Sequence, residues 1–120
     1  MEALIIDDSR VLRRLLGDML RHIGFEVREA NNGREGMEQL RLRPMPDVVL
    51  VDWNMPVMNG LQFVEAVRSQ DEFSQLPIMM VTSETEFARV ETAITAGANE
   101  YVMKPFDQDV IAEKLQLLGF

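Results

Sequence analysis

Short runs of apolar residues alternate along the chain with segments in which apolar residues recur every three or four positions. The short runs are typical of buried parallel strands, and the recurring positions are typical of helices that cover a sheet. Five strand and helix units are predicted, with strands at 4–6, 25–30, 47–51, 78–81 and 101–103 and helices that contain 11–23, 37–40, 61–67, 87–96 and 110–118. This order predicts an α/β fold, a doubly wound five-stranded parallel sheet with five helices on its two faces.

The first and third predicted helices have clear start or stop signals. Ser9 precedes the first helix and Asn59 the third, and both residue types cap helix N-termini with a side-chain oxygen. Gly24 ends the first helix. The apolar positions assigned to one face of the first helix are Val11, Leu12, Leu15, Leu16, Met19, Leu20 and Ile23.

Composition limits the classes of function. The chain has 120 residues, 47% of them hydrophobic, and no linker or repeat, so residues 1–120 are predicted to form one domain. The absence of cysteine excludes disulfides and thiolate metal sites. A formal charge of −8 would repel nucleic-acid phosphates. No apolar run approaches the ~20 residues of a membrane span, and the first residues lack a signal peptide. We therefore expect a cytoplasmic protein without direct nucleic-acid or membrane partners.

Polar side chains stand at the carboxyl ends of four predicted strands. Asp7 and Asp8 follow the first strand, Asp52 the third, Thr82 the fourth and Lys104 the fifth. In doubly wound sheets, ligands bind at this edge. Singly, each residue has an ordinary explanation as a cap or a turn residue. Their joint occurrence at one edge favours a binding site.

The chemistry of these groups predicts a cation beside a phosphoryl group. Converging carboxylates repel each other unless a cation neutralises them, and oxygen ligands without His or Cys favour Mg²⁺. The Thr82 hydroxyl and the Lys104 ammonium are suited to bind phosphoryl oxygens. Asp52 can be the nucleophile, because carboxylates form aspartyl phosphates.

Together these residues resemble the response-regulator receiver family, and in particular its stand-alone chemotaxis regulators, over the whole chain. The motifs that carry the resemblance are Asp7-Asp8, the segment 52–56 with Gly60, Thr82 and the segment 101–106. The resemblance implies the strand order 2-1-3-4-5, for which such a chemotaxis protein is a standard example. It also implies that Asp52 accepts a phosphoryl group from a sensor histidine kinase. Asp8, Asp52 and the main-chain carbonyl of Asn54 would bind Mg²⁺ directly, and Asp7 would act mainly through water.

The resemblance further implies how the signal leaves the site. Thr82 and Lys104 would bind the phosphoryl group, and Tyr101 would swing inward as Thr82 moves. The face formed by the fourth helix, the fifth strand and the fifth helix would then change. Asn54 and Glu84 occupy positions that tune hydrolysis of the acyl phosphate in this family, and Pro105 is expected to follow a cis peptide bond.

The expected partners are therefore a histidine kinase and a downstream protein effector, with a flagellar motor switch protein as the favoured example. We expect a monomer that assists its own phosphorylation and dephosphorylation and is not itself an enzyme. Because no output domain follows Phe120, we expect signalling by protein binding. A phosphorelay intermediate, or a receiver cut from a larger regulator, remains an alternative.

Two other classes share parts of the pattern. A phosphatase with an Asp nucleophile would need a second Asp two residues later, where this chain has Asn54, which cannot transfer the proton. A flavodoxin-like cofactor binder would need a Ser, Thr and Gly loop after the first strand, and Asp7 and Asp8 would repel the flavin phosphate. Both classes are disfavoured.

Overall fold

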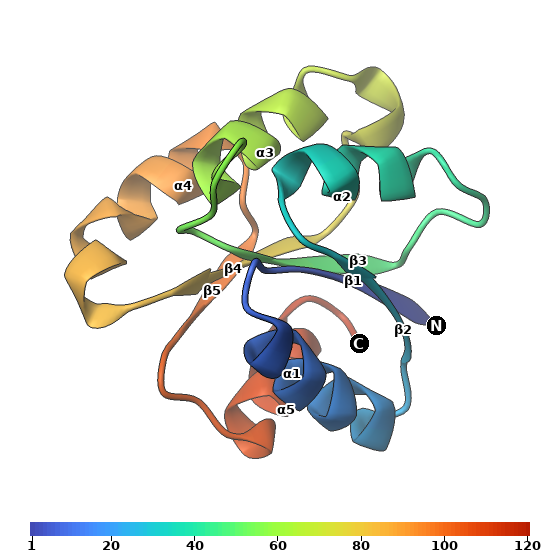
Figure 1. The fold of residues 1–120 in the computed structure, drawn as a ribbon, viewed down its shortest axis with the longest axis vertical. Helices are drawn as coiled ribbons and strands as arrows, with labels where there is room; N and C mark the ends of the chain where they lie inside the picture. Colours follow the sequence, from blue (N-terminus) through green and yellow to red (C-terminus); the bar gives the residue numbers. More distant parts are fainter.

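The computed structural model describes the backbone of residues 1–120 and all side chains other than those of Glu84 and Phe87. Its elements, in chain order, are β1 (Glu2–Ile6), α1 (Arg10–Ile23), β2 (Glu26–Ala30), α2 (Gly33–Leu40), β3 (Val48–Asp52), α3 (Gly60–Arg68), the 3-10 helix η1 (Asp71–Phe73), β4 (Ile78–Thr82), the 3-10 helix η2 (Glu84–Arg89), α4 (Val90–Ala96), β5 (Glu100–Met103) and α5 (Gln108–Leu117). The strands form one parallel sheet in the order β2-β1-β3-β4-β5, which confirms the expected topology (Figure 1).

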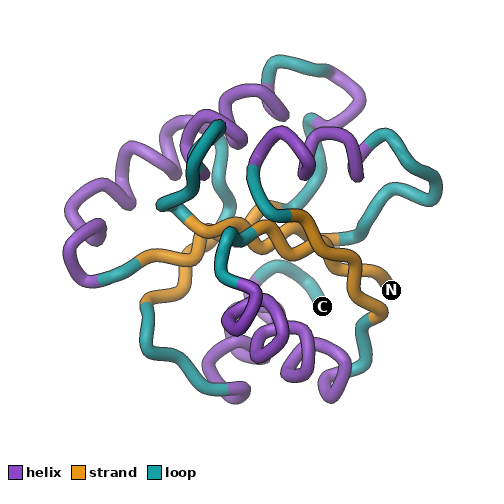
Figure 2. The backbone as a smooth tube through the Cα atoms, viewed as in Figure 1, coloured by secondary structure: helices purple, strands orange, loops and turns teal.

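The sheet lies between two layers of helices, with α1 and α5 on one face and α2, α3 and α4 on the other (Figures 1 and 2). Alternate residues of each central strand therefore face different cores. On β3, Val49 and Val51 pack in the core that contains Phe63 of α3, whereas Leu50 packs with Leu16 of α1. This double coverage explains why β3 is a continuous apolar run.

The helix ends follow the sequence signals. The Ser9 side chain accepts the N–H of Leu12, and Asn59 forms a reciprocal capping box with Gln62, as the two residue types predicted. Gly24 ends α1 with φ of 125°, a left-handed conformation that costs glycine little.

The buried face of α1 is narrower than the apolar pattern predicted. Leu16 and Leu20 are buried, but residues Val11 and Leu15 are 80% and 49% exposed. A helix that packs on one side of a sheet buries only one stripe, and these seven apolar positions cover a wider arc. Val11 and Leu15 therefore leave an apolar patch on the surface.

The segment before α4 also differs from the prediction. The sequence predicted one helix from residue 87, but residues 84–89 form a 3-10 helix and α4 begins at Val90. Within the part of the chain that the structure describes, no helix is both long enough and apolar enough to cross a bilayer.

Candidate functional site

Parallel strand registers bring the candidate residues to one edge of the sheet. Asp52 is the last residue of β3 and pairs with Val81, the residue before Thr82 on β4. Thr82 in turn pairs with Met103, the residue before Lys104. Asp7 follows β1, and its N–H donates to the carbonyl of Ala30 (3.1 Å) at the end of β2. The expected convergence of these residues is present.

Three carboxylates meet at this edge. Asp7, Asp8 and Asp52 each place a carboxylate oxygen within 4.8 Å of the others. Asp7 and Asp52 are only 2% and 4% exposed. Burial raises the pKa of Asp7, against the opposing effect of the Ser9 N–H, which donates to its carboxylate (2.8 Å). Three carboxylates, two of them buried, offer only oxygen ligands. Such a set fits a hard cation such as Mg²⁺, which would offset the repulsion between the carboxylates.

Lys104 is the cationic partner that the described residues give to Asp52. The Lys104 ammonium donates to a carboxylate oxygen of Asp52 at 3.0 Å. Burial nevertheless raises the pKa of Asp52 from 3.8 to about 6, because the loss of hydration outweighs the hydrogen bond from Lys104, and Asp7 adds repulsion. The ionised carboxylate is therefore held in an unfavourable setting, which further positive charge would relieve.

Thr82 carries a buried hydroxyl without a partner. Its side chain is fully buried, and its Oγ1 has no hydrogen-bond partner among the described residues. Buried polar groups are hydrogen-bonded in the great majority of cases, so an exception calls for an explanation. A ligand oxygen that arrives beside Asp52 would provide the missing acceptor.

The loop after Asp52 is held tightly against the strand end. The N–H of Gly60 donates to the carbonyl of Trp53 (2.9 Å). A Cβ at Gly60 would lie 2.5 Å from the main-chain oxygen of Asp52, so only glycine fits there. At the tip of the loop, Val57 has φ of 70° and the N–H of Met58 donates to the carbonyl of Pro56 (2.7 Å). This three-residue turn is strained for a β-branched residue.

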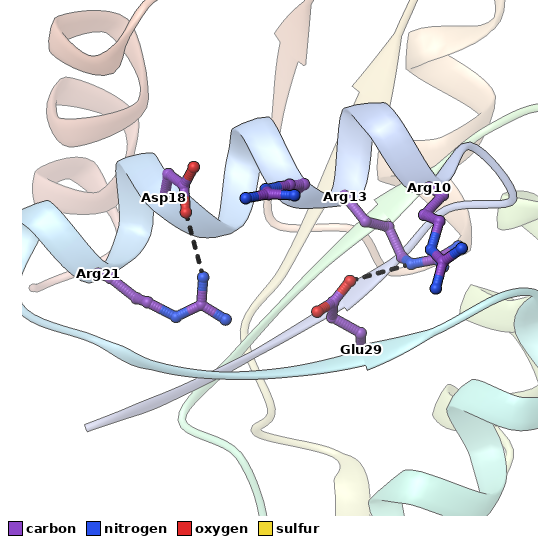
Figure 3. Close-up of a pocket in the computed structure, with 6 residues that line it drawn as sticks. Arg10, Arg13, Asp18, Arg21 and Glu29 are labelled. Carbon is purple, nitrogen blue, oxygen red and sulfur yellow. Dashed lines mark hydrogen bonds and ion pairs between the residues drawn. The ribbon is translucent and has the colours of Figure 1, made fainter.

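The sequence reading missed Arg13, which supports the acidic pair. Its guanidinium donates to the main-chain carbonyl of Asp7. It also donates to the carboxylate of Glu29 on β2 at 3.1 Å, as Figure 3 shows. The Arg13 side chain is only 11% exposed. The available signal was weak, since Arg13 is one of several arginines in a helix and only the fold brings it to Glu29.

The remaining expected residues lie as follows. Tyr101 is on β5 and is partly buried, and its ring lies below the Lys114 ammonium. The bond between Lys104 and Pro105 is cis. Asn54 has an exposed side chain in the loop after β3. The Glu84 side chain lies outside the described residues.

The comparison with protein families gives the class of domain to which this sheet and its polar edge belong. Residues 3–116 match the family described as the response regulator receiver domain. The chain belongs to this family, whose members are phosphorylated in a reaction that depends on Mg²⁺.

Named relatives narrow the similarity to chemotaxis regulators. The chain is 44% identical to the chemotaxis protein CheY1 of Helicobacter pylori over 98% of this chain and 96% of that protein. It is 42% identical to the CheY homologue of Campylobacter jejuni over 97% and 90% of the two chains. Among solved structures, CheY4 of Vibrio cholerae matches with a TM-score of 0.89 and 35% identity over 98% and 97% of the chains.

Proposed function

We propose that Asp52 accepts a phosphoryl group from the phosphohistidine of a sensor kinase, and that the modified chain binds a target protein of a chemotaxis pathway. The whole of residues 1–120 would act as one receiver domain. The support is the constellation at the sheet edge together with the similarity to chemotaxis proteins CheY. A flagellar motor switch protein is the favoured target, and a phosphorelay partner is the alternative.

The transfer exchanges one bond for another. A carboxylate oxygen of Asp52 attacks phosphorus, and the bond between phosphorus and the imidazole nitrogen breaks, so that the electron pair leaves with the imidazole. The Lys104 ammonium, 3.0 Å from a carboxylate oxygen of Asp52, would neutralise charge on the phosphoryl oxygens. Asp7, Asp8 and Asp52 would hold Mg²⁺, with the main-chain carbonyl of Asn54 as a further ligand. The ion, when bound, offsets negative charge around the transferring group.

The observation that carries this proposal is the buried hydroxyl of Thr82, which has no hydrogen-bond partner within the described part of the chain. A phosphoryl oxygen on Asp52 would accept its hydrogen bond and draw the side chain toward the acid. Charge-assisted hydrogen bonds contribute roughly 1.5–3 kcal/mol each. Contacts to Thr82, Lys104 and neighbouring amides could therefore supply most of the ~5.5 kcal/mol that reverses a 1:99 equilibrium. The inward movement of Tyr101 and the change in the face of α4, β5 and α5 would follow.

The kinase must contact the residues around Asp52, because Asp52 itself is buried. A groove of about 340 Å³ beside the site is lined by Leu12, Leu15, Lys104, Pro105 and Phe106. We place the kinase contact at this groove and the adjacent Val11, because exposed apolar side chains that gather next to a reactive group mark interaction sites. Leu15→Lys is then expected to slow transfer from the phosphorylated kinase but not from acetyl phosphate. Leu117→Lys, at an exposed leucine of α5, is the matched control.

The acceptor is tested by labelling with radioactive acetyl phosphate in Mg²⁺. Asp52→Asn is expected to abolish labelling, whereas Asp71→Asn, the same change at an exposed acid of η1, is expected to leave it unchanged. Full labelling of the Asp52→Asn variant would refute the acceptor assignment.

Trp53 provides a second test of the same site. It is the only tryptophan, it follows Asp52 and it is buried. Its fluorescence is expected to change on addition of Mg²⁺ and again on addition of beryllofluoride, a stable mimic of the acyl phosphate. A flat response to both would contradict the metal and phosphoryl assignments. Pull-down with purified motor switch proteins, with and without beryllofluoride, then separates a chemotaxis target from a relay partner.

A further inference from the structure

The edge of the sheet at β5 carries a contact that the proposed function does not use. β5 is one of the two edge strands, and Lys114 of α5 reaches to it. The Lys114 ammonium lies 4.6 Å from the centroid of the Tyr101 ring and 3.3 Å from a carboxylate oxygen of Glu100. The same oxygen accepts the main-chain N–H of Tyr101 at 2.9 Å. One carboxylate and one ammonium thus hold both the backbone and the ring of the tyrosine.

Withdrawal from solvent strengthens the contact between the Lys114 ammonium and the Tyr101 ring. An ammonium within ~6 Å of an aromatic centroid is attracted to the face of the ring, and more strongly when it is removed from water. The side chains of Lys114 and Glu100 are 24% and 17% exposed, so both are largely withdrawn from solvent. Glu100 also orients the ammonium, because an ion pair restricts a side chain that is otherwise long and mobile.

We propose that Lys114 is a positioning residue for the switch: it holds the Tyr101 ring in its resting place, and Glu100 keeps Lys114 over the ring. This inference rests on the proposed function, because it concerns the equilibrium that phosphorylation of Asp52 would shift. If the ring moves inward, its contact with Lys114 is given up. The contact therefore stabilises the resting conformation and raises the phosphoryl occupancy that is needed to switch.

A purely structural role for Lys114 would have a different signature. Charged residues at a sheet edge discourage pairing with other chains, and Glu100 of β5 with Lys114 of α5 beside it could serve only that purpose. Its loss would then change stability or association but not the balance between resting and switched conformations. A measurement of the conformation of the Tyr101 ring distinguishes the two roles.

The chain offers such a measurement, because Tyr101 is its only tyrosine. Protein labelled with 3-fluorotyrosine therefore gives a ¹⁹F signal from the Tyr101 ring alone. The signal is recorded in Mg²⁺ with and without beryllofluoride, and Trp53 fluorescence gives the beryllofluoride concentration at half saturation. Lys114→Met removes the cation but keeps a long side chain, and Lys114→Arg keeps the cation. Arg34→Met, at an exposed arginine of α2 on the other side of the sheet from α5, controls for the change in net charge.

In Lys114→Met the resting ¹⁹F signal is expected to shift toward its position in the beryllofluoride form. The half-saturating concentration of beryllofluoride is expected to fall about two- to fivefold. This is the change in an equilibrium constant that corresponds to the loss of a partly exposed contact between a cation and an aromatic ring. Glu100→Gln is expected to produce a smaller change in the same direction, and Lys114→Arg and Arg34→Met to behave as the unmodified protein.

The opposing outcomes are distinct. A resting signal and a half-saturating concentration that stay unchanged in Lys114→Met, while Trp53 still responds, would overturn the role of Lys114 and leave the acceptor site intact. An equal change in Arg34→Met would also overturn it, because net charge would then be the cause. If Lys114→Met fails to fold, Glu100→Gln decides by the same two readouts. A flat Trp53 response in the unmodified protein would instead refute the proposed function, and with it the coupling.

Discussion

The raised pKa of Asp52 predicts that its ionised carboxylate, without a bound metal ion, destabilises the fold at neutral pH. The pKa of about 6 in the folded chain exceeds the ordinary value of 3.8 that applies after unfolding. The folded chain therefore binds more protons between these two values, and its stability falls as the pH rises through this window. A difference of about two pH units corresponds to about 3 kcal/mol at full ionisation. Asp52→Asn removes this cost.

The expected gain depends on pH in a defined way. In metal-free buffer, Asp52→Asn should raise the free energy of unfolding by up to about 3 kcal/mol at pH 7.5 and by about half of that at pH 5. Magnesium at ten times its dissociation constant should then stabilise the unmodified protein by about 1.4 kcal/mol and the variant by much less. Urea denaturation followed by far-ultraviolet circular dichroism, with EDTA or with Mg²⁺, measures each quantity.

The control is again Asp71→Asn, because an exposed acid without such burial should change stability by less than about 0.5 kcal/mol at both pH values. Equal stability of Asp52→Asn and the unmodified protein at pH 7.5 would refute the argument. So would a gain that is the same at pH 5 and pH 7.5, because it would have a cause other than ionisation.

Four further substitutions, three at the site or in its loop and one at the opposite edge of the sheet, test packing by urea denaturation. Thr82→Val should raise stability by about 1 kcal/mol, because it removes a buried hydroxyl that has no partner among the described side chains, and should weaken the fluorescence response to beryllofluoride. Val57→Asn should also gain about 1 kcal/mol, because asparagine tolerates the left-handed φ of 70° and the valine is exposed. Gly60→Ala should lose about 1–3 kcal/mol, because its Cβ would meet main-chain oxygen. Arg68→Met should lose about 3 kcal/mol, because the guanidinium donates to three main-chain carbonyls and to Asn99.

Each of these has an outcome that contradicts it. Lower stability of Thr82→Val would mean that the hydroxyl has a partner in solution. No gain in Val57→Asn, with Val57→Gly as a second variant, would mean that the turn is not strained. A neutral Gly60→Ala would show that the loop shifts freely, and a neutral Arg68→Met would show that water replaces the guanidinium.

The sequence was most informative where the signals are local. Apolar periodicity located five strands and five helices, and Ser9, Asn59 and Gly24 act as the caps that their types predicted. The sheet order followed from the family resemblance, because periodicity says nothing about which strands are neighbours. The start of α4 was wrong, since tertiary context decides whether a weakly apolar segment such as 84–89 becomes an α-helix or a 3-10 helix.

By itself, the sequence determined which groups stand at the strand ends, because parallel strands that end in Asp, Thr and Lys must deliver them to one edge. Only the tertiary structure decided how these groups behave. The pKa of Asp52 and the orphaned hydroxyl of Thr82 depend on burial by distant segments. The exposure of Leu15 and the contact of Lys114 with Tyr101 depend on how helices lie against the sheet. The local pattern encodes where strands and helices lie and which residues stand at the strand ends. Desolvation and pairing of these side chains arise from atoms that are far apart in the chain and close in space.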